Sequence, residues 1–311
     1  MTLSIIIVSY NTAKLTLQAI QSAIDSINRS KILKNNCEII VVDNNSQDNT
    51  LELIDKSLKI KNLKFEIIIN QENLGFSQAN NQGIKIARGQ YILLLNSDTI
   101  VLENALEKLV ASLENNKKLG IVAAQLLNKD QTLQPQGGDR LSLISLANQM
   151  FFLDDIPILG KLLPSVQHTG KNSRLVNKST SGLVYQDWVG GTAMMIRKKV
   201  LDQVGLLDED IFMYAEDVEL CYRAQEKNWQ IAIDPAAPII HLGSQSSSSK
   251  NAILGELNGY LYIFSKHFSR FEYLLAYLII KIGVLLRILI FATISKDEKR
   301  QAIYRQALAE I

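Results

Sequence analysis

Three widely separated positions carry side chains that could bind a cation or move a proton. Asp98 ends the run YILLLNSD, Glu216 and Asp217 lie in FMYAEDVELC, and His241 ends IAIDPAAPIIH. An apolar run that ends in a charged group is how an α/β sheet delivers such groups to the crevice at its strand ends. If these positions converge, they could hold a divalent cation, a diphosphate and a general base in one cleft. That chemistry would suit the transfer of a group from an activated nucleotide.

Each of these positions also has a purely structural interpretation. Acids such as Glu216 and Asp217 are common in the first turn of a helix, where the macrodipole keeps them ionised, although an ionised acid also suits a base. His241 could be an ordinary strand-end residue, or its neutral imidazole could complete a cation site with Asp98. Mg²⁺ typically takes one or two carboxylates together with substrate phosphates, so Asp98 could serve as one such ligand.

Short apolar runs alternate with helical patterns in the first third of the chain. The runs are Ser4–Val8, Glu38–Val42, Phe65–Ile69 and Tyr91–Leu95. They are rich in Ile and Val, as expected for strands that are covered on both faces. Between them, apolar residues recur at helical spacing over 20–27, and a less regular helical pattern follows over 105–113. This alternation predicts βαβ units and an α/β fold with a mostly parallel sheet.

Each predicted strand ends in polar residues, namely SYN, DNNS, NQEN and NSDT. Because parallel strands share a direction, these tips should lie on one edge of the sheet, where open α/β folds bind ligands. Asn, Asp and Ser also form turns, so any single tip could be only a turn. Asp43 could accept hydrogen bonds from a nucleobase or a ribose, or feed a helix capped near Asp48. The Gly-rich dinucleotide and P-loop patterns are absent from the sequence.

The second half of the chain is less regular at first. Residues 126–187 indicate loops, short helices and a mobile segment. We then expect a strand over 188–197, a short helix closed by Gly205, a helix over 215–228 and a strand over 229–234. A Ser-rich stretch over 244–250 predicts a flexible loop.

A pair of glycines follows Trp188 in this region. Gly190 and Gly191 could let the backbone approach a bound sugar closely, beside an aromatic ring. Glycine within a strand could equally mark a bulge.

Composition narrows the function classes. The 311 residues carry a formal net charge of +2, too balanced to favour nucleic-acid binding. The two cysteines, Cys37 and Cys221, lack metal-ligand spacing, and a reduced, cytosolic compartment is expected. The N-terminal apolar stretch is too short for a secretory signal and leads directly into the first strand.

The segment 271–294, FEYLLAYLIIKIGVLLRILIFATI, is long enough to cross a bilayer as a helix. Its cations Lys281 and Arg287 would each cost about 2.5–3.5 kcal/mol at the centre of a spanning helix. We therefore expect a helix in the headgroup region with both cations reaching to the surface, supported by the basic residues that follow. The alternatives are a helix that packs on the domain, one that joins two subunits of a homodimer, and a true span.

Together these motifs, in this order, resemble glycosyltransferase family 2, the inverting enzymes with a GT-A fold, and within it the rhamnosyltransferase-like branch. The matching stretches are SIIIVSYN, VVDNNSQDNT, ENLGFSQANNQGIKIARGQYILLLNSDT, WVGGTAMMIRKKVLDQVGLLDEDIFMYAEDVELCYRAQEKNWQI and HLGSQS, over about residues 3–245. The resemblance implies a Rossmann-like nucleotide-binding sheet, mostly parallel, with helices on both faces and a C-terminal helical tail.

The resemblance also implies roles for individual residues. Asp43 would contact the base of the donor nucleotide, Asp98 would hold Mn²⁺ or Mg²⁺, and Asp217 would be the catalytic base. His241 would be a late metal or diphosphate contact. The remaining donor-binding residues would be Ser9, Asn11, Asn45, Asn73, Gly75, Asn80 and Asn96, and the acceptor-binding residues Trp188, Gly190, Gly191 and Glu216. Asn96 replaces the first acid of the family's acidic motif, which leaves one carboxylate and weakens the expectation of tight cation binding.

These inferences predict an organisation and an activity. Residues 1–125 would bind the donor, 126–250 would bind the acceptor and supply the base, and 251–311 would form an amphipathic helical tail. The donor would be a dTDP- or UDP-sugar, with rhamnose as a candidate, and the acceptor a glycan or lipid-linked hydroxyl in cell-surface polysaccharide synthesis. The enzyme would lie on the cytoplasmic face of the membrane.

Two other functions stay open. One is a catalytically weak nucleotide-sugar-binding or scaffold protein of the same fold. The other is a nucleotidyltransferase, which should carry a Gly-rich basic loop where this chain has SYNTAKLT.

Overall fold

The computed structural model describes residues 1–57, 63–156, 158–168, 182–243 and 249–311. The chain forms two compact units. Unit 1 comprises residues 1–136 and 175–246, and unit 2 comprises residues 137–174 and 247–311. A mid-chain segment therefore belongs with the C-terminal helices. The division into donor and acceptor halves near residue 125 concerns function and stays a prediction.

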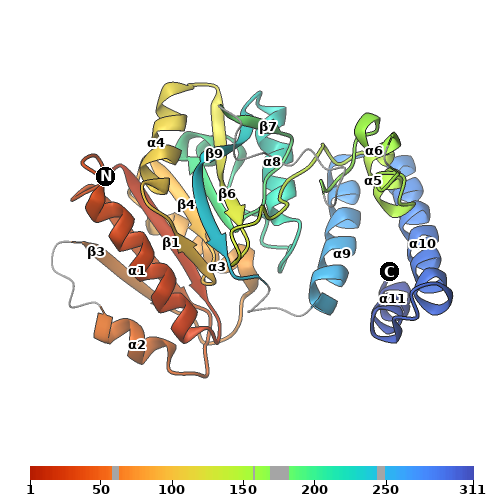
Figure 1. The fold of residues 1–311 in the computed structure, drawn as a ribbon, viewed down its shortest axis with the longest axis horizontal. Coiled ribbons are helices and arrows are strands. Elements are labelled where there is room, and N and C mark those ends of the chain that lie inside the picture. The colour runs from red at the N-terminus through yellow and green to blue at the C-terminus, as the bar shows by residue number, and fades with distance from the viewer. Residues whose placement is uncertain (58–62, 157, 169–181, 244–248) are drawn as a thin grey trace. The chain divides into compact units, whose positions relative to one another are not determined.

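Unit 1 is built on one mixed sheet with the strand order β3-β2-β1-β4-β8-β6-β9-β5, and β7 pairs with β9 (Figure 1). The strands are β1 (Leu3–Ser9), β2 (Cys37–Asp43), β3 (Lys64–Ile69), β4 (Tyr91–Leu95), β5 (Thr99–Val101), β6 (Leu119–Leu127), β7 (Val184–Gln186), β8 (Ala193–Arg197) and β9 (Gln230–His241). β1 to β4 form a parallel block and β6 runs parallel to β9, while β8 is antiparallel to both β4 and β6. The mostly parallel α/β fold is confirmed.

Two predicted strand boundaries are wrong. The strand expected over 188–197 begins only at Ala193, because residues 189–192 form the loop that contains the glycine pair. The strand expected to end at Asp234 continues to His241. Its register against β6 jumps from Asp234 to Pro238, so the intervening residues bulge out of the ladder. Proline is tolerated at such bulges, which explains why a proline-containing run still pairs.

Helices cover both faces of the sheet, as expected. They are α1 (Ala13–Arg29), α2 (Thr50–Ser57), α3 (Gly75–Ile86), α4 (Ala105–Asn115), α7 (Lys198–Val204) and α8 (Glu216–Glu226). Figure 1 shows α1 and α4 over one face, where their apolar residues join Ile5 and Ile7 of β1 in the core. Ile6 points to the opposite face, and a Cβ on Gly83 of α3 would come within 2.7 Å of it. Alternation along β1 therefore buries both faces.

The strand ends that carry polar residues meet at one edge of the sheet. The start of antiparallel β8 lies beside the end of β4, and the Asn96 amide donates to the Thr192 carbonyl at 2.9 Å. β5 runs antiparallel to β9, so Thr99 pairs with His241. The Leu242 amide donates to the Asp98 carbonyl at 2.9 Å. Register alone thus brings residues from the middle and the end of unit 1 together.

Unit 2 is helical. It contains α5 (Leu143–Met150), α6 (Leu159–Leu162), α9 (Ser249–His267), α10 (Arg270–Thr293) and α11 (Glu298–Glu310). α10 packs against α5, α9 and α11. Among the described residues, α10 is the one helix that is both long enough and apolar enough to cross a membrane. The flexible loop predicted over 244–250 lies mostly outside the described residues, and its last two positions begin α9.

Arg287 of α10 contradicts the prediction that both tail cations reach the surface. Its guanidinium is buried and donates to the carbonyls of Gln149 at 2.8 Å and Met150 at 2.6 Å. It also lies over the Phe152 ring, 4.3 Å from the centroid. The cation therefore bonds the last two carbonyls of α5, at a helix C-terminal end, where positive charge is favoured.

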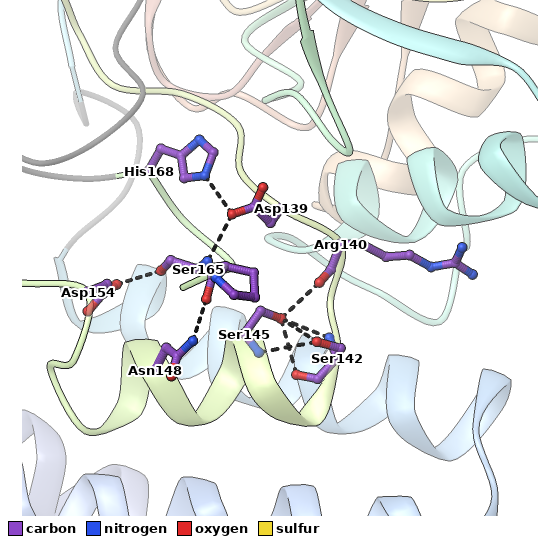
Figure 2. A network of polar contacts seen from close by, with 9 residues as sticks. Asp139, Arg140, Ser142, Ser145, Asn148, Asp154, Ser165 and His168 are labelled. Carbon is purple, nitrogen blue, oxygen red and sulfur yellow. Dashed lines mark hydrogen bonds and ion pairs between the residues drawn. The ribbon is translucent and has the colours of Figure 1, made fainter. Parts of the chain in front are cut away.

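Polar contacts hold the mid-chain segment of unit 2 together (Figure 2). Asp139 Oδ2 accepts the Ser165 amide at 3.0 Å and lies 2.9 Å from His168 Nε2. The Ser165 hydroxyl donates to Asp154, and Asn148 donates to the Pro164 carbonyl at 2.7 Å. These contacts join the segment before α5 to the segment after it. The described part of region 126–187 contains loops and the short helices α5 and α6, as predicted, but also the strand β7, which was not predicted. Residues 169–181 lie outside the description.

Candidate active site

Asp98 and His241 lie in contact. His241 Nε2 is 3.3 Å from Asp98 Oδ1, and the Asp98 side chain is almost fully buried. His241 Nδ1 lies 2.7 Å from Gln134 Oε1, so with this amide orientation Nδ1 carries the hydrogen. Nε2 then presents a lone pair to a carboxylate oxygen, an arrangement that is stable only with a proton or a cation between them. Sequence reasoning missed Gln134, which lies in a region without recognisable periodicity.

The Asp98–His241 pair fits part of a metal site. Adjacent ligand atoms of an octahedral Mg²⁺ site, each about 2.1 Å from the metal, are about 3 Å apart, close to the observed separation. Asn96, two residues before Asp98, could supply a further oxygen, because its Oδ1 is buried and has no hydrogen-bond partner. No group of three or more His, Cys, Asp or Glu residues converges within the described ranges. The protein would therefore supply a partial ligand set that substrate phosphates complete.

Asp43, the last residue of β2, has one carboxylate oxygen in a hydrogen bond with the protein and one without. Oδ2 accepts the Ser46 amide at 3.1 Å, whereas buried Oδ1 has no partner. An unsatisfied buried acceptor costs about 1–3 kcal/mol, a cost that a ligand N–H would remove. The turn-forming and ligand-binding interpretations of Asp43 are therefore compatible.

The loops after β1 and β2 are tied to each other. Asn11 Oδ1 accepts the Gln47 amide at 2.7 Å, and the Asn11 amide donates to Ser46 Oγ at 3.0 Å. The Asn45 carbonyl accepts from Gln47 Nε2 at 3.2 Å. Asn11 and Asn45 both have positive φ, at 55° and 68°, a conformation that Asn tolerates better than most residues. These contacts shape the two loops, and direct donor contacts by Asn11 and Asn45 stay predictions.

A buried asparagine that sequence reasoning did not single out organises the loop before α3. Asn44 Oδ1 accepts from Asn70 Nδ2 at 3.0 Å and from the Leu74 amide at 3.1 Å. Asn44 Nδ2 donates to Asn73 Oδ1 at 2.8 Å, and Asn73 Oδ1 also accepts the Gly75 amide at 3.0 Å. The only sequence signal is the second polar residue in DNNS. Asn73 therefore has a structural role in addition to its predicted role in donor binding.

Glycine is required at position 75. Its φ is +82°, and a Cβ there would lie 2.5 Å from the Phe212 carbonyl oxygen. The next residue, Phe76, donates its amide to that same carbonyl at 2.7 Å. The loop before α3 is thus locked against the segment that leads to α8.

Ser9 and Asn80 make internal contacts. Ser9 Oγ lies 2.7 Å from Thr16 Oγ1, on the side of α1. Asn80 Nδ2 donates to the Phe76 carbonyl at 2.9 Å within α3. Both side chains are almost completely buried. Their predicted donor-binding roles stay predictions.

Asp217 lies in the first turn of α8 and faces the glycine pair. Its Oδ2 accepts the Gly191 amide at 2.9 Å, and its Oδ1 accepts the Val218 amide at 2.8 Å. A Cβ on Gly190 would meet only Asp217 Oδ2, at 3.9 Å. Burial raises the pKa of Asp217 despite these hydrogen bonds. The site thus contains a carboxylate of increased basicity beside backbone that carries no side chain.

The turn that leads into α8 is strained, and a second acid begins the helix. Tyr214 and Ala215 both have left-handed backbone, with φ of 72° and 70°. Glu216 follows, 5% exposed, and its Oε2 has no hydrogen-bond partner. Burial and then the charge of Asp217 raise the pKa of Glu216 to about 8. Burial therefore raises the pKa of both neighbouring acids, Glu216 and Asp217.

Two aromatic residues flank the glycine pair. A Cβ on Gly191 would lie 3.5 Å from Phe76 Cε1 and 3.8 Å from Asp217 Cβ, so ring and acid border the same space. Trp188 is 8% exposed and so offers little surface to a ligand. Sequence reasoning selected Trp188 and missed Phe76, although Phe76 stands next to the glycine of the matching ENLGF stretch.

A protein-family model described as Glycosyl transferase family 2 matches residues 4–168. Glycosyltransferase GlyG of Streptococcus pneumoniae is 31% identical over 130 residues, which cover 42% of this chain and 40% of GlyG. The poly-beta-1,6-N-acetyl-D-glucosamine synthase of Staphylococcus aureus is 28% identical over 203 residues, which cover 64% of this chain and 41% of the synthase. The matches thus span about two fifths of the length of these relatives.

Solved structures share the fold. GalNAc-T7 with UDP, GalNAc and Mn²⁺ has a TM-score of 0.61 at 17% identity, covering 85% of this chain and 48% of that one. The mannosyltransferase PcManGT of Pyrobaculum calidifontis with GDP-Man and Mn²⁺ has a TM-score of 0.57 at 14% identity, covering 99% and 74%. TarS 1–349 of S. aureus has a TM-score of 0.55 at 16% identity, covering 100% and 82%. The GT-A-like fold is thereby shown.

Proposed function

Because the chain belongs to glycosyl transferase family 2, we propose that it is an inverting glycosyltransferase in which Asp217 is the catalytic base. The observation that carries this proposal is the contact between Asp217 and the glycine pair, on a loop that is also bonded to the end of β4. Gly191 donates to Asp217, and the next residue, Thr192, accepts from Asn96. Asp217 and the end of β4, which leads to Asp98, are thus both bonded to the same loop, through the adjacent residues Gly191 and Thr192.

In the proposed reaction, Asp217 takes the proton of the acceptor hydroxyl while that oxygen attacks the anomeric carbon. A new carbon–oxygen bond forms on the face opposite the diphosphate, the old one breaks, and the anomeric configuration inverts. A base works best when its pKa lies near the working pH, so the raised pKa of Asp217 favours this step. The absence of side chains at Gly190 and Gly191 leaves room for a sugar beside the base.

Asp98 and His241 would hold Mn²⁺ or Mg²⁺, with the free Asn96 Oδ1 as a further oxygen donor. A cation bound there would stabilise the charge that develops on the departing diphosphate. The structures of GalNAc-T7 and PcManGT that share this fold contain Mn²⁺. We propose that binding is moderate, because a single carboxylate provides less attraction than two.

The donor in this proposal is a dTDP- or UDP-sugar. Uracil and thymine present the same N–H, which the unpartnered Asp43 Oδ1 could accept. Rhamnose is a candidate sugar, and residues 1–125 form the donor half. TarS has been solved with UDP-GlcNAc and PcManGT with GDP-Man, so donors of the nucleoside-diphosphate class are the first to test.

The acceptor would be a hydroxyl of a glycan or of a lipid-linked saccharide used for cell-surface polysaccharide, bound mainly by residues 126–250. The similarity to a poly-N-acetylglucosamine synthase supports this class. We place the enzyme on the cytoplasmic side, where nucleotide sugars are the expected substrates.

A catalytically weak nucleotide-sugar-binding protein is the second candidate. Asn96 favours it, because this position leaves a single carboxylate in NSD. Retention of binding without transfer would identify this function.

The donor can be tested by thermal shift with UDP-GlcNAc, UDP-Gal, dTDP-rhamnose and GDP-mannose, with and without Mn²⁺. A ligand present at 100 times its Kd stabilises the native state by about 2.7 kcal/mol. We expect one uridine or thymidine donor to raise the Tm, and Mn²⁺ to increase that shift. Asp98→Asn should remove the increase in the Tm shift that Mn²⁺ causes. Asp130→Asn, on an exposed turn, should leave that increase unchanged. A Tm that no donor raises would contradict the proposal.

A further inference from the structure

One face of α10 is apolar and uncovered. Its members recur every three or four residues, which places them in one line along the helix. Each is between 49% and 70% exposed, and together they form the α10 stripe: Phe271, Leu274, Leu278, Ile282, Leu285 and Leu289. An uncovered apolar line of this length implies an apolar partner.

The opposite face of α10 is committed to unit 2. Ala276, Ile280 and Val284 are fully buried, and a Cβ on Gly283 would lie 2.6 Å from Met150 Cε. Buried Arg287 binds the end of α5 on this side. Arg287, one of the two cations that the sequence counted against a spanning helix, therefore does not face the partner.

This packing argues against a transmembrane orientation. A spanning helix must meet lipid or other spanning segments around its whole circumference. α10 instead packs against α5, α9 and α11, and among the described residues only α10 is long and apolar enough to span. A helix that is covered on one side and apolar on the other fits a position parallel to a membrane surface.

The charges around the stripe favour an anionic lipid surface over a second copy of the chain. Besides the buried Arg287, residues 266–305 contain seven Lys and Arg against three Asp and Glu. Lys281 is partly exposed on α10, and its Nζ lies 4.6 Å from the Tyr277 ring centroid. A symmetric dimer through the stripe would bring two such positive surfaces together, whereas anionic headgroups attract them.

We infer that unit 2 docks on an anionic membrane surface, with α10 lying along the lipid and the α10 stripe inserted between the headgroups. This inference does not depend on the proposed sugar transfer. It identifies the partner by chemistry, namely a bilayer with negative headgroups, and it makes the stripe the part of the protein that enters the apolar layer.

The test is co-sedimentation of the full chain with vesicles of phosphatidylcholine alone or with one quarter phosphatidylglycerol. We expect binding to the anionic vesicles that is at least tenfold stronger than to the neutral ones and that weakens with salt. The double variant Leu278→Glu/Leu285→Glu should lose at least tenfold in affinity. The matched control Ile32→Glu/Ile86→Glu places the same charges at exposed apolar positions of unit 1 and should bind as wild type.

A second measurement covers the case in which the Glu variant fails to fold. Leu278→Cys and Ile86→Cys can be labelled with a polarity-sensitive fluorophore, because Cys37 and Cys221 are both buried. On anionic vesicles, only the label at position 278 should show fluorescence emission that shifts to shorter wavelength. Wild type that does not bind these vesicles, a label at 278 that stays in water, or a stripe-dependent dimer in solution would overturn the inference.

Discussion

The backbone amide of Gly191 donates a hydrogen bond to Asp217 Oδ2 at 2.9 Å, although the two residues lie 26 positions apart. The neighbouring Thr192 carbonyl accepts the Asn96 amide at 2.9 Å. The candidate base is therefore held in place by the protein before any substrate binds. Such preorganisation reduces the entropic cost of reaching a reactive geometry.

Gly75→Ala should destabilise the protein more than Gly243→Ala. The two glycines have similar φ, +82° and +76°, but a Cβ at 75 would meet the Phe212 carbonyl at 2.5 Å and one at 243 would meet nothing within 4 Å. We expect a loss of about 1 kcal/mol at 243 from strain alone and about 2–4 kcal/mol at 75, where a clash adds to it. Urea unfolding of both variants measures the difference, and equal losses would refute the role given to this contact.

Ala215→Gly should cost less stability than a glycine substitution inside a helix. Ala215 has a φ of 70°, a region that glycine occupies without steric cost. The relief of about 1–2 kcal/mol offsets the entropy gained by the unfolded chain, about 0.4–1 kcal/mol, and the loss of a buried methyl group, about 0.8 kcal/mol. Ala111→Gly inside α4 is the control and should cost about 1 kcal/mol. An equal loss of stability at the two positions would show that the left-handed turn is not strained.

Glu216→Gln should flatten the dependence of stability on pH. The pKa of Glu216 is about 8 in the folded protein and near 4.5 in an unfolded chain. Between these values the native state binds more protons than the unfolded state, so the free energy of unfolding falls as pH rises from about 4.5 to 8. Tm measured from pH 5 to 8.5 should decline in the wild type and decline less in Glu216→Gln. Parallel curves would show that Glu216 is already ionised.

Arg287→Met should destabilise unit 2. It removes the charged hydrogen bonds to the carbonyls of Gln149 and Met150, each worth about 1.5–3 kcal/mol, but methionine retains part of the packing. We expect a net loss of about 2–4 kcal/mol and faster amide exchange in α5. Lys281→Met is the control and should change stability by less than about 0.5 kcal/mol. Similar exchange in the two variants would contradict the capping role of Arg287.

Hydrophobic periodicity predicted the parts of the fold whose buried residues are aliphatic. β1, β2 and β4 contain buried runs of Ile, Val and Leu, and α1 shows a regular apolar spacing. β3 was also predicted, but it lies at the edge of the sheet without a fully buried residue, so the expectation that its run is covered on both faces is wrong. α3 was not predicted, because its buried residues other than Ile84 are small or polar. They include Asn80, which bonds within the helix, and Asn81, which bonds the Leu207 carbonyl. A pattern search for apolar residues does not detect a helix of that kind.

Contacts between residues far apart in the sequence were the other feature that sequence patterns could not predict. The contact between Asp98 and His241 depends on the pairing of β5 with β9, and β5 is only three residues long. The placement of Arg287 depends on α5, a mid-chain helix whose position beside α10 has no local sequence signal. Sequence could propose that the acids converge, but register and helix packing decide which atoms meet.

The most direct test of the account is transfer by Asp217→Asn. The variant should bind the donor diphosphate as the wild type does, because an asparagine side chain would keep the shape of the site, while transfer falls by about 10²–10⁴-fold with the loss of the base. Asp202→Asn on the exposed face of α7 should leave both unchanged. Transfer by Asp217→Asn at close to the wild-type rate, with inverted product, would contradict the assignment of the catalytic base.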